Sequence, residues 1–169
     1  MRYIPTQGPV PQATDHRMSS KEKSERWTIC NHSHVHWGAD GAAGFLFRYV
    51  PLDGEPLYLL QQRTRWVHHG GTWGIPGGAI KDRESPEMTA QREVQEEIGS
   101  LPTYRVAGVA VQDCGGGWKF HIVTADVDRP FDAFCGQETE ATGWFTREEM
   151  RYLSLDPGIQ KWLSRGEEE

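Results

Sequence analysis

Residues 78–101 read GAIKDRESPEMTAQREVQEEIGSL, and this stretch governs how the rest of the chain is interpreted. Ser85 is a good N-cap residue, and Pro86 is well suited to the first helical position that follows it. Gly99 is typical of the residue just past a helix end. The sequence therefore predicts one short helix between Ser85 and Gly99.

The expected helix has an acidic side and an apolar side. At about 100° per residue, Glu93, Glu96 and Glu97 fall within one arc of roughly 100°. The neighbouring arc holds Ala90, Val94 and Ile98. Like charges four residues apart destabilise a helix, so three carboxylates on one stripe indicate a compensating divalent cation. Taken alone, the helix is equally compatible with a solvated acidic face.

A glycine-rich segment precedes the helix. Residues 73–78 read WGIPGG, and such a run lets the backbone turn tightly and present carbonyl groups to a ligand. Glu84 follows in the connecting loop, where it is expected to form a bidentate ion pair with Arg92 on the helix. This pair would hold the loop against the helix.

Together these residues resemble the Nudix box, the signature of the Nudix hydrolases. The matching identities, at the family's spacing, are Gly78, Glu84, Arg92, Glu93, Glu96, Glu97 and Gly99. One position departs from the pattern, because Ser100 stands where the family has an apolar residue and Leu101 follows it. That position serves packing, so we expect a small local shift and no loss of activity.

The resemblance implies the Nudix fold, an α/β/α sandwich around a mixed β-sheet. Strands on both sides of a central helix, with a further helix at the C-terminus, suggest the same α/β class. The expected reaction is hydrolysis of a nucleoside diphosphate linked to another group. The expected cofactor is Mg²⁺, with Mn²⁺ as a substitute, bound by carboxylates and the Gly78 carbonyl. The candidate ligands and catalytic residues in the box are Gly78, Glu84, Arg92, Glu93, Glu96 and Glu97.

A further glutamate is expected from the loop before the last strand. In the Nudix family this residue commonly lies about six positions ahead of an aromatic residue and either binds metal or positions the attacking water. Glu138 has that spacing to Trp144 and is the candidate metal ligand and catalytic residue. Glu140 is the alternative.

Substrate contacts are expected from residues 64–72, which form a surface loop beside the box. Arg63 and Arg65 could bind phosphate and Trp66 could stack on a base, although solvated side chains are commoner on such loops. His68 and His69 are either polar loop residues or a general acid. Trp118 is either a core residue, which the pattern favours, or a second stacking surface.

The substrate class is less well defined. The Pro76-Gly77-Gly78 segment resembles the nucleoside triphosphate branch, which favours conversion of a (d)NTP to the NMP and pyrophosphate. Residues 103–129 lack the proline typical of ADP-ribose hydrolases and a clear match to the tyrosine of dinucleoside polyphosphate hydrolases. A nucleotide-sugar or ADP-ribose type pyrophosphatase is the alternative. A non-catalytic binding or regulatory module is disfavoured because the box has no gap.

Composition limits the number of domains, the class of binding partner and the expected location. The chain has 169 residues, 37% of them hydrophobic, which suits one domain with a real core. Its net charge of −6 argues against binding long nucleic acid, so a small nucleotide is the expected partner. No apolar run long enough for a membrane span and no signal peptide is recognised, so the expected location is cytoplasmic. A monomer or homodimer is expected.

The predicted organisation is a flexible arm at residues 1–26, a Nudix hydrolase domain at 27–166 and an acidic tail at 167–169. Within the domain, one hairpin is expected from residues 37–50 and 57–63. A second hairpin is expected from residues 104–111 and 118–127, joined through the segment 113–117. The pattern near the C-terminus indicates a short helix with a capping box from Thr146 and a last helix over residues 157–165.

The three cysteines, Cys30, Cys114 and Cys135, are odd in number and widely spaced, which favours reduced thiols over a disulfide framework. Residues 30–36 read CNHSHVH, and alternate residues of a strand share a face, so a metal site is conceivable there. A structural zinc site normally shows a second ligand pair at short spacing, and none is present. The segment is therefore interpreted as a polar lead into a strand.

Overall fold

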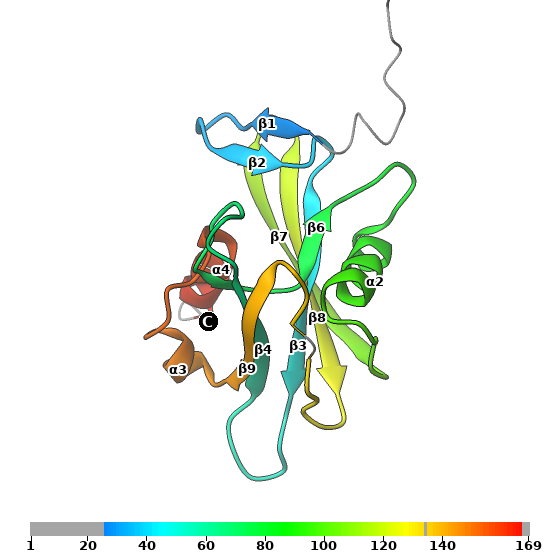
Figure 1. The fold of residues 1–169 in the computed structure, drawn as a ribbon, viewed down its shortest axis with the longest axis vertical. Helices are drawn as coiled ribbons and strands as arrows, with labels where there is room; N and C mark the ends of the chain where they lie inside the picture. Colours follow the sequence, from blue (N-terminus) through cyan, green and yellow to red (C-terminus); the bar gives the residue numbers. More distant parts are fainter. Residues whose placement is uncertain (1–25, 134, 167–169) are drawn as a thin grey trace, which may run out of the picture.

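The computed structural model describes residues 26–133 and 135–166, so most of the predicted arm and all of the acidic tail lie outside the described residues. The elements are, in order, β1 (Trp27–Ile29), β2 (Val35–Trp37), β3 (Ala42–Tyr49), β4 (Leu57–Arg63), β5 (Trp73–Gly74), β6 (Gly77–Ala79), α2 (Pro86–Glu97), β7 (Arg105–Gly115), β8 (Trp118–Val127), β9 (Thr139–Phe145), α3 (Arg147–Met150) and α4 (Pro157–Arg165). Figure 1 shows a twisted central sheet with α2 on one side and α3 and α4 on the other.

The main sheet is mixed. Its strand order is β5-β4-β3-β8-β7, with β6 also paired to β3 and β9 also paired to β4. The central pair β3 and β8 is parallel, whereas the other pairs are antiparallel. Arg48 on β3 and Asp126 on β8 form an ion pair across the parallel pair, with Arg48 Nε 2.7 Å from Asp126 Oδ1. Strands β1 and β2 form a separate two-stranded sheet, called the N-terminal hairpin below.

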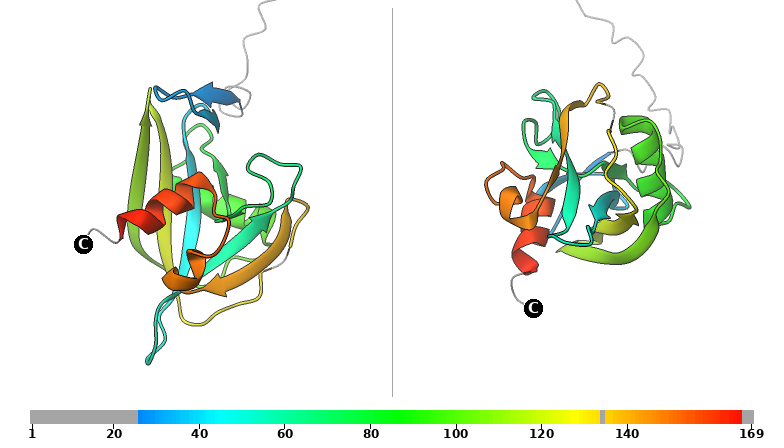
Figure 2. Two further views of the ribbon diagram at one scale, coloured as in Figure 1. Left: turned by 90° about the vertical axis from the view of Figure 1, so that its left-hand side faces the viewer. Right: turned by 90° about the horizontal axis from the view of Figure 1, so that it is seen from below.

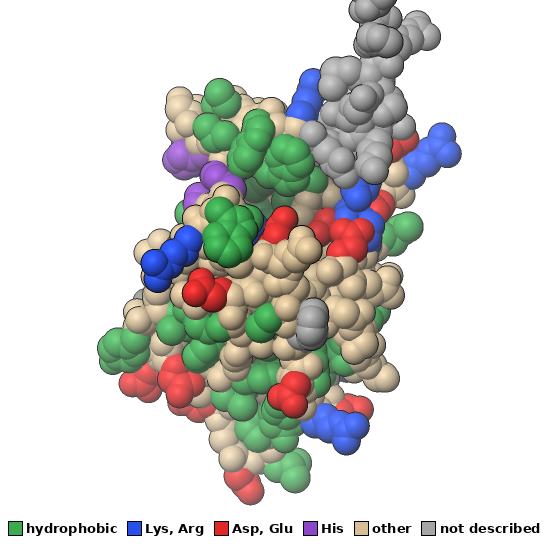
Figure 3. Space-filling view, in the orientation of Figure 1, with side chains coloured by type: hydrophobic (Ala, Val, Ile, Leu, Met, Phe, Trp, Pro, Cys, Tyr) green, Lys and Arg blue, Asp and Glu red, His purple; other side chains and the backbone are tan. Residues whose placement is uncertain are grey.

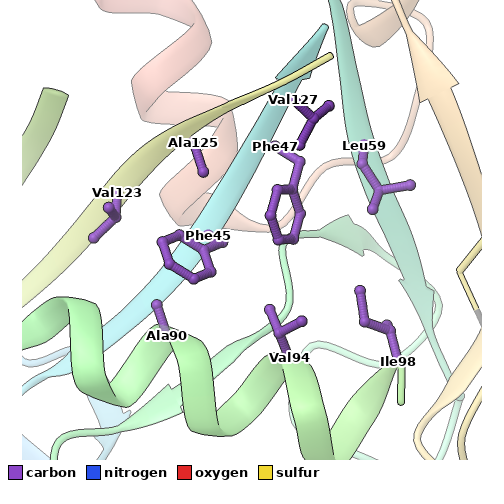
Figure 4. Packing of buried hydrophobic residues seen from close by; sticks show 9 residues of the cluster. All are labelled: Phe45, Phe47, Leu59, Ala90, Val94, Ile98, Val123, Ala125 and Val127. Atoms are coloured by element: carbon purple, nitrogen blue, oxygen red, sulfur yellow. The ribbon is translucent and has the colours of Figure 1, made fainter. Parts of the chain in front are cut away.

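Strands β3 and β4 are buried on both faces, because they are apolar at successive positions. Phe45 and Phe47 on β3 face α2, where Ala90 and Val94 complete the contact (Figure 4). Leu46, between the two phenylalanines, packs on the opposite face. There the cluster includes Tyr58, Leu60, Ile75, Ile122, Met150, Ile159 and Leu163.

Figure 2 shows the resulting layers, with α2 on one side of the sheet and α3 and α4 on the other. The predicted α/β/α sandwich is therefore confirmed. The capping box from Thr146 is present at the start of α3, and the last predicted helix is α4. Neither these helices nor α2 is long and apolar enough to cross a membrane.

The first predicted hairpin is only partly formed. Strands β3 and β4 pair at just two positions, Arg48 with Tyr58 and Tyr49 with Leu57. The strands then diverge, because the beginning of β3 pairs with β6 and the end of β4 pairs with β5 and β9. A Cβ atom on Gly44 would lie 2.5 Å from the carbonyl oxygen of Pro76, so this close approach requires glycine.

Two other sequence-based expectations need correction. The segment from Trp73 to Gly78 is not purely a loop, because its ends form the short strands β5 and β6 on either side of Ile75 and Pro76. The second hairpin also reaches further than expected, since β7 continues to Gly115 and pairs there with Trp118.

The cysteines are also paired differently from the prediction. Cys30 and Cys114 form a disulfide with their Cα atoms 5.7 Å apart, and Cys135 is free and exposed. The two paired cysteines are 84 residues apart in sequence. They meet because the N-terminal hairpin packs on the tip of the β7–β8 hairpin (Figure 1).

Candidate active site

The acidic helix begins and ends where the sequence predicts. Ser85 is the N-cap, and its hydroxyl oxygen accepts a hydrogen bond from the Met88 amide at 3.2 Å. Past the other end, Gly99 has a φ of +90°, in the left-handed region that favours glycine. The helix is therefore fixed at both ends by its own residues, and its carboxylates have a defined orientation.

Arg92 anchors the loop that precedes the helix. Its Nε and Nη2 donate to the two carboxylate oxygens of Glu84 at 2.8 and 2.9 Å, which is the predicted bidentate pair. Nη2 also donates to the carbonyl oxygen of Ala79 at 2.9 Å. The hydrogen bonds from Arg92 lower the pKa of Glu84 to about 2, and they raise the pKa of Arg92 itself.

Glu84 makes two further contacts. Its Oε2 accepts from the Thr89 hydroxyl at 2.8 Å and from the Lys81 amide at 3.2 Å. Both carboxylate oxygens are thus engaged in holding the loop to the helix. This geometry gives Glu84 a positioning role rather than a place in the pocket.

Glu93 lies between Arg92 and the glycine strand β6. Arg92 Nη1 donates a hydrogen bond to Glu93 Oε1. A Cβ atom on Gly78 would lie 2.5 Å from the same Glu93 oxygen, so a larger residue there would displace this carboxylate. Burial raises the pKa of Glu93, and the pairing with Arg92 partly offsets that effect.

A pocket of about 290 Å³ opens beside these carboxylates. It is lined by Glu93, Glu96, Glu97, Gly136, Gln137, Glu138 and Thr139. The structure therefore brings the three helical glutamates and the loop glutamate together, although 41 residues separate Glu97 from Glu138 in the sequence. Figure 3 shows acidic and basic side chains next to one another on the face below the N-terminal hairpin.

Glu97 is the most deeply placed of these carboxylates. Burial raises its pKa to about 8, and the charges of Glu93 and Glu138 act in the same direction. Gln61 on β4 opposes this shift, because its side-chain nitrogen donates a hydrogen bond to Glu97 Oε2. The carbonyl end of Gln61 accepts from the Thr139 hydroxyl at 3.1 Å.

Sequence reasoning missed the role of Gln61. The residue is only 3% exposed, and it lies on a strand whose preceding residues, Leu59 and Leu60, are apolar and buried. A glutamine that continues such an apolar run was the available signal, because a buried amide requires specific partners.

The structure distinguishes the two candidate loop glutamates. Glu138 lines the pocket, whereas Glu140 does not. Thr139, between them, directs its hydroxyl to Gln61, and the pairing of β9 with β4 shifts its register at this point, between Gln62 and Arg63. The carbonyl oxygen of Glu138 accepts a hydrogen bond from the Thr64 amide at 3.0 Å, which links this loop to residues 64–72.

Residues 64–72, the predicted substrate loop, lie beside the pocket. The side chains in and next to this loop differ in their contacts and exposure. Arg63 Nε donates to the carbonyl oxygen of His68 at 3.0 Å, and its positive charge lowers the pKa of Glu97. Arg65 is exposed, and Trp66 is 80% exposed, so both are accessible to a ligand. Burial lowers the pKa of His68, which favours its neutral form at neutral pH.

Trp118 lies elsewhere. Its ring stacks on His36 of β2 with the ring centroids 3.7 Å apart, and its indole nitrogen is buried without a hydrogen-bond partner. It belongs neither to the two core clusters nor to the residues lining the carboxylate pocket. Of the four predicted substrate contacts, Arg63, Arg65 and Trp66 lie on one connected segment and Trp118 does not.

The pocket fits a hard divalent cation. Its candidate ligands are the carboxylate oxygens of Glu93, Glu96, Glu97 and Glu138. The charge of Glu96 raises the pKa of Glu93, and the charges of Glu93 and Glu138 raise that of Glu97, so these carboxylates repel one another. Bound Mg²⁺ would relieve this repulsion and supply oxygen-preferring coordination.

Comparisons with known proteins agree with this geometry. The NUDIX domain family matches residues 47–165. Among solved structures, a Nudix hydrolase from M. smegmatis, RenU, superimposes with a TM-score of 0.72 and 34% identity. That alignment covers 85% of this chain and 93% of RenU.

Curated relatives carry more specific names. A Mycobacterium tuberculosis protein named "Putative 8-oxo-dGTP diphosphatase 3" is 38% identical over 139 residues, covering 79% of this chain and 64% of the relative. A CMP-5'-(N-acetyl-N-hydroxy-3-aminopropyl)phosphonate hydrolase of Streptomyces rubellomurinus is 46% identical over 113 residues, covering 66% of this chain and 52% of the relative. The chain thus spans between half and two thirds of the length of these two relatives.

Proposed function

Because this chain belongs to the NUDIX domain family, we propose that it is a metal-dependent hydrolase that converts a (d)NTP to the NMP and pyrophosphate. The observation that carries the proposal is the pocket in which Glu93, Glu96, Glu97 and Glu138 converge. Four carboxylates around one cavity have little structural use without a cation. With Mg²⁺ bound, they form a site for a polyphosphate.

The residues that line the pocket and those that support it would have three roles. Glu93, Glu96, Glu97 and Glu138 would hold the cation, which supplies charge neutralisation of the diphosphate and a more acidic water. Glu97 would also accept the proton of the attacking water, and the hydrogen bond that Gln61 donates to it supports this role. Arg92 and Glu84 would hold the loop that follows β6 against α2. Glu93 would then face the pocket.

The nucleotide would be bound from the side of residues 64–72. Thr64 is hydrogen-bonded to Glu138, so this loop is attached directly to the carboxylate pocket. Arg63 and Arg65 carry the positive charge that a triphosphate requires, and Trp66 offers an exposed ring for stacking on a base. The name of the mycobacterial relative makes 8-oxo-dGTP the first compound to test.

The experiment is a substrate screen with Mg²⁺ that includes 8-oxo-dGTP, the four dNTPs, ADP-ribose, a nucleotide sugar and a CMP-linked phosphonate. Release of pyrophosphate and of inorganic phosphate is measured separately. We expect turnover of a nucleoside triphosphate with pyrophosphate as the inorganic product. Turnover confined to ADP-ribose, the sugar nucleotide or the phosphonate would refute the triphosphate assignment and retain the hydrolase.

The second candidate is hydrolysis of a nucleoside diphosphate linked to a group other than phosphate. The Streptomyces relative, whose name describes a CMP-linked phosphonate, favours this alternative. The two candidate reactions differ in the group that leaves when the anhydride is cleaved. It is pyrophosphate from a (d)NTP, and a phosphorylated sugar or a phosphonate from the alternative substrates. A non-catalytic binding module is the third possibility, and tight nucleotide binding without turnover of any compound in the screen would support it.

A further inference from the structure

A second group of potential metal ligands lies outside the carboxylate pocket. Cys30, His34, His36 and Cys114 each offer one ligand atom, and these four atoms all lie within 4.8 Å of one another. None of the four residues lines the carboxylate pocket. Two thiols and two imidazoles are the ligand set of a structural zinc site, whereas Mg²⁺ prefers oxygen.

The turn between β1 and β2 brings three of these residues together. The Cys30 amide donates to the carbonyl oxygen of His34 at 3.0 Å, and the Ser33 amide donates to the carbonyl oxygen of Cys30 at 2.9 Å. Ser33 has a φ of 62°, which closes the turn. His34 and His36 are two residues apart, so a strand directs both side chains to one face.

The β7–β8 tip supplies the fourth ligand, which sequence spacing could not reveal. Gly115 and Gly116 allow this approach, because a Cβ atom on either would lie 3.1 or 3.0 Å from the Asn31 side chain. His32 adds a contact, with its Nδ1 2.7 Å from the carbonyl oxygen of Cys114. The N-terminal hairpin is therefore held against Cys114 by contacts that require no sulfur chemistry.

The distances around Cys114 suit a tetrahedral ion. Its sulfur lies 3.3 Å from His36 Nε2 and 3.5 Å from His34 Nδ1. Bonds of about 2.3 Å to sulfur and about 2.05 Å to nitrogen, at the tetrahedral angle, give a sulfur to nitrogen separation of about 3.6 Å. Movement of the Cys30 sulfur away from the Cys114 sulfur would open the centre of the group for an ion.

We propose that the reduced chain binds one Zn²⁺ through Cys30, His34, His36 and Cys114. A dithiol reductant breaks the Cys30–Cys114 bond and is itself oxidised to a disulfide, leaving two thiols. Zn²⁺ then displaces one proton from each thiol to solvent and binds two neutral imidazoles. The site has two alternative states, a disulfide and a zinc thiolate, in which the same two cysteines join the same two elements.

Zinc at this position would stabilise the N-terminal hairpin. A two-stranded sheet is marginal by itself in water, and Trp27, Ile29, Val35 and Trp37 on this hairpin are all substantially exposed. Trp27 also contacts His68 of the substrate loop, with ring centroids 4.9 Å apart. The ion would therefore fix the edge of the loop that carries Arg65 and Trp66.

The test uses the full chain, reduced with a dithiol and then freed of reductant and metal under anaerobic conditions. It is titrated with Zn²⁺ and separately with Co²⁺. We expect one tightly bound Zn²⁺ per chain, a higher melting temperature, and the absorption bands of tetrahedral Co²⁺ with thiolate ligands. Hydrogen exchange over residues 27–37 should slow when Zn²⁺ is bound.

Four variants make the result specific. Cys114→Ser and His34→Gln should weaken Zn²⁺ binding at least about tenfold, because loss of a direct ligand exceeds the 10–100-fold cost of outer contacts. His34 is exposed, so its replacement spares the fold if Cys114→Ser does not fold. Cys135→Ser, which removes the free exposed cysteine, and Glu97→Gln, which alters the carboxylate pocket, should both retain thiolate-bound Co²⁺.

Three outcomes would overturn the proposal. One is a reduced chain that binds no Zn²⁺ and shows no thiolate bands with Co²⁺. Another is binding that survives both Cys114→Ser and His34→Gln. The third is oxidation of the two thiols to the Cys30–Cys114 disulfide by an added small-molecule disulfide, which is itself reduced to thiols, at the same rate with and without Zn²⁺. None of these outcomes concerns nucleotide hydrolysis, so the zinc site and the proposed reaction can fail independently.

Discussion

The amide nitrogen of Thr64 donates a hydrogen bond to the carbonyl oxygen of Glu138, with 3.0 Å between the two atoms. This bond joins two segments that the sequence separates by more than seventy residues, the loop with Arg65 and Trp66 and the loop that completes the carboxylate pocket. It also explains why Glu138, and not Glu140, is held beside the helix.

Glu138→Gln should lower kcat by about 10²–10⁴-fold if the carboxylate holds metal or orients the water, the range for a positioned acid or base. Glu140→Gln is the matched control, and its kcat should stay within about threefold of wild type. The measurement is steady-state hydrolysis of the best substrate at saturating Mg²⁺. A larger loss in Glu140→Gln than in Glu138→Gln would reverse the assignment.

Glu97→Gln should reduce kcat by several orders of magnitude while the fold persists, because it removes charge at nearly constant volume. The melting temperature of the metal-free protein should not fall, since burial and the charges of Glu93 and Glu138 already disfavour the ionised form. Glu148→Gln on α3 is a control that changes charge far from the pocket. A variant that keeps more than about a tenth of the wild-type rate, a loss under roughly 1.4 kcal/mol, would show that Glu97 is not central.

Activity should depend on a divalent cation. Chelation with EDTA should abolish turnover, and excess Mg²⁺ or Mn²⁺ should restore it, because the pocket carboxylates would otherwise repel a polyphosphate. Restoration should be followed as initial rate against free metal concentration. Full activity in the presence of chelator would contradict the assignment of the pocket as a metal site.

Arg92→Lys should lower kcat strongly, because one ammonium group cannot replace the planar contacts of Arg92 to Glu84, Glu93 and Ala79. Glu84→Gln should also lower kcat, since it breaks the same bidentate pair. A double-mutant cycle in kcat should give a loss smaller than the sum of the two single losses. Additive losses would mean that the two side chains act separately.

Glu84 should also make stability depend on pH in the acid range. Its pKa in the folded chain, about 2, lies below the ordinary value of 4.5, so ionised Glu84 stabilises the fold. That contribution is complete above about pH 4.5 and is lost as the pH falls towards about 2. After allowance for solvent screening it is between about 1 and 3 kcal/mol.

The measurement is the free energy of unfolding by denaturant from pH 7 to pH 3 in the presence of chelator. The wild-type chain should lose more stability over this range than Glu84→Gln. Glu148→Gln, which removes an exposed carboxylate, should follow the wild-type curve. Parallel curves for wild type and Glu84→Gln would show that the Arg92 pair contributes no net stability.

The local structure of the box could be predicted because its determinants lie close together in sequence. Ser85, Pro86 and Gly99 define the helix ends, and the 100° periodicity separates the acidic stripe from Ala90 and Val94. The pair between Arg92 and Glu84 followed from the same geometry. These contacts are set by residues within about two helical turns and one loop.

The contacts that the sequence did not predict depend on pairings between segments that are distant in the sequence. Gln61 acquires its role only when β4 lies beside α2, and Cys114 approaches Cys30 only when the two hairpins pack together. Trp118 was favoured as a core residue, but the hairpin tip that carries it lies beyond the core clusters. Register and strand order decide such contacts, and a single sequence encodes them only weakly.

The parallel pairing of β3 with β8 also bears on how the chain folds. Arg48 and Asp126, which meet across this pair, are 78 residues apart, and α2 lies inside the segment that they close. Closing so long a loop is slow, and the helix can pack on Phe45 only once its sheet face exists. We therefore expect the capacity to bind Mg²⁺ to emerge during refolding in the same kinetic phase as burial of the core, and not before it.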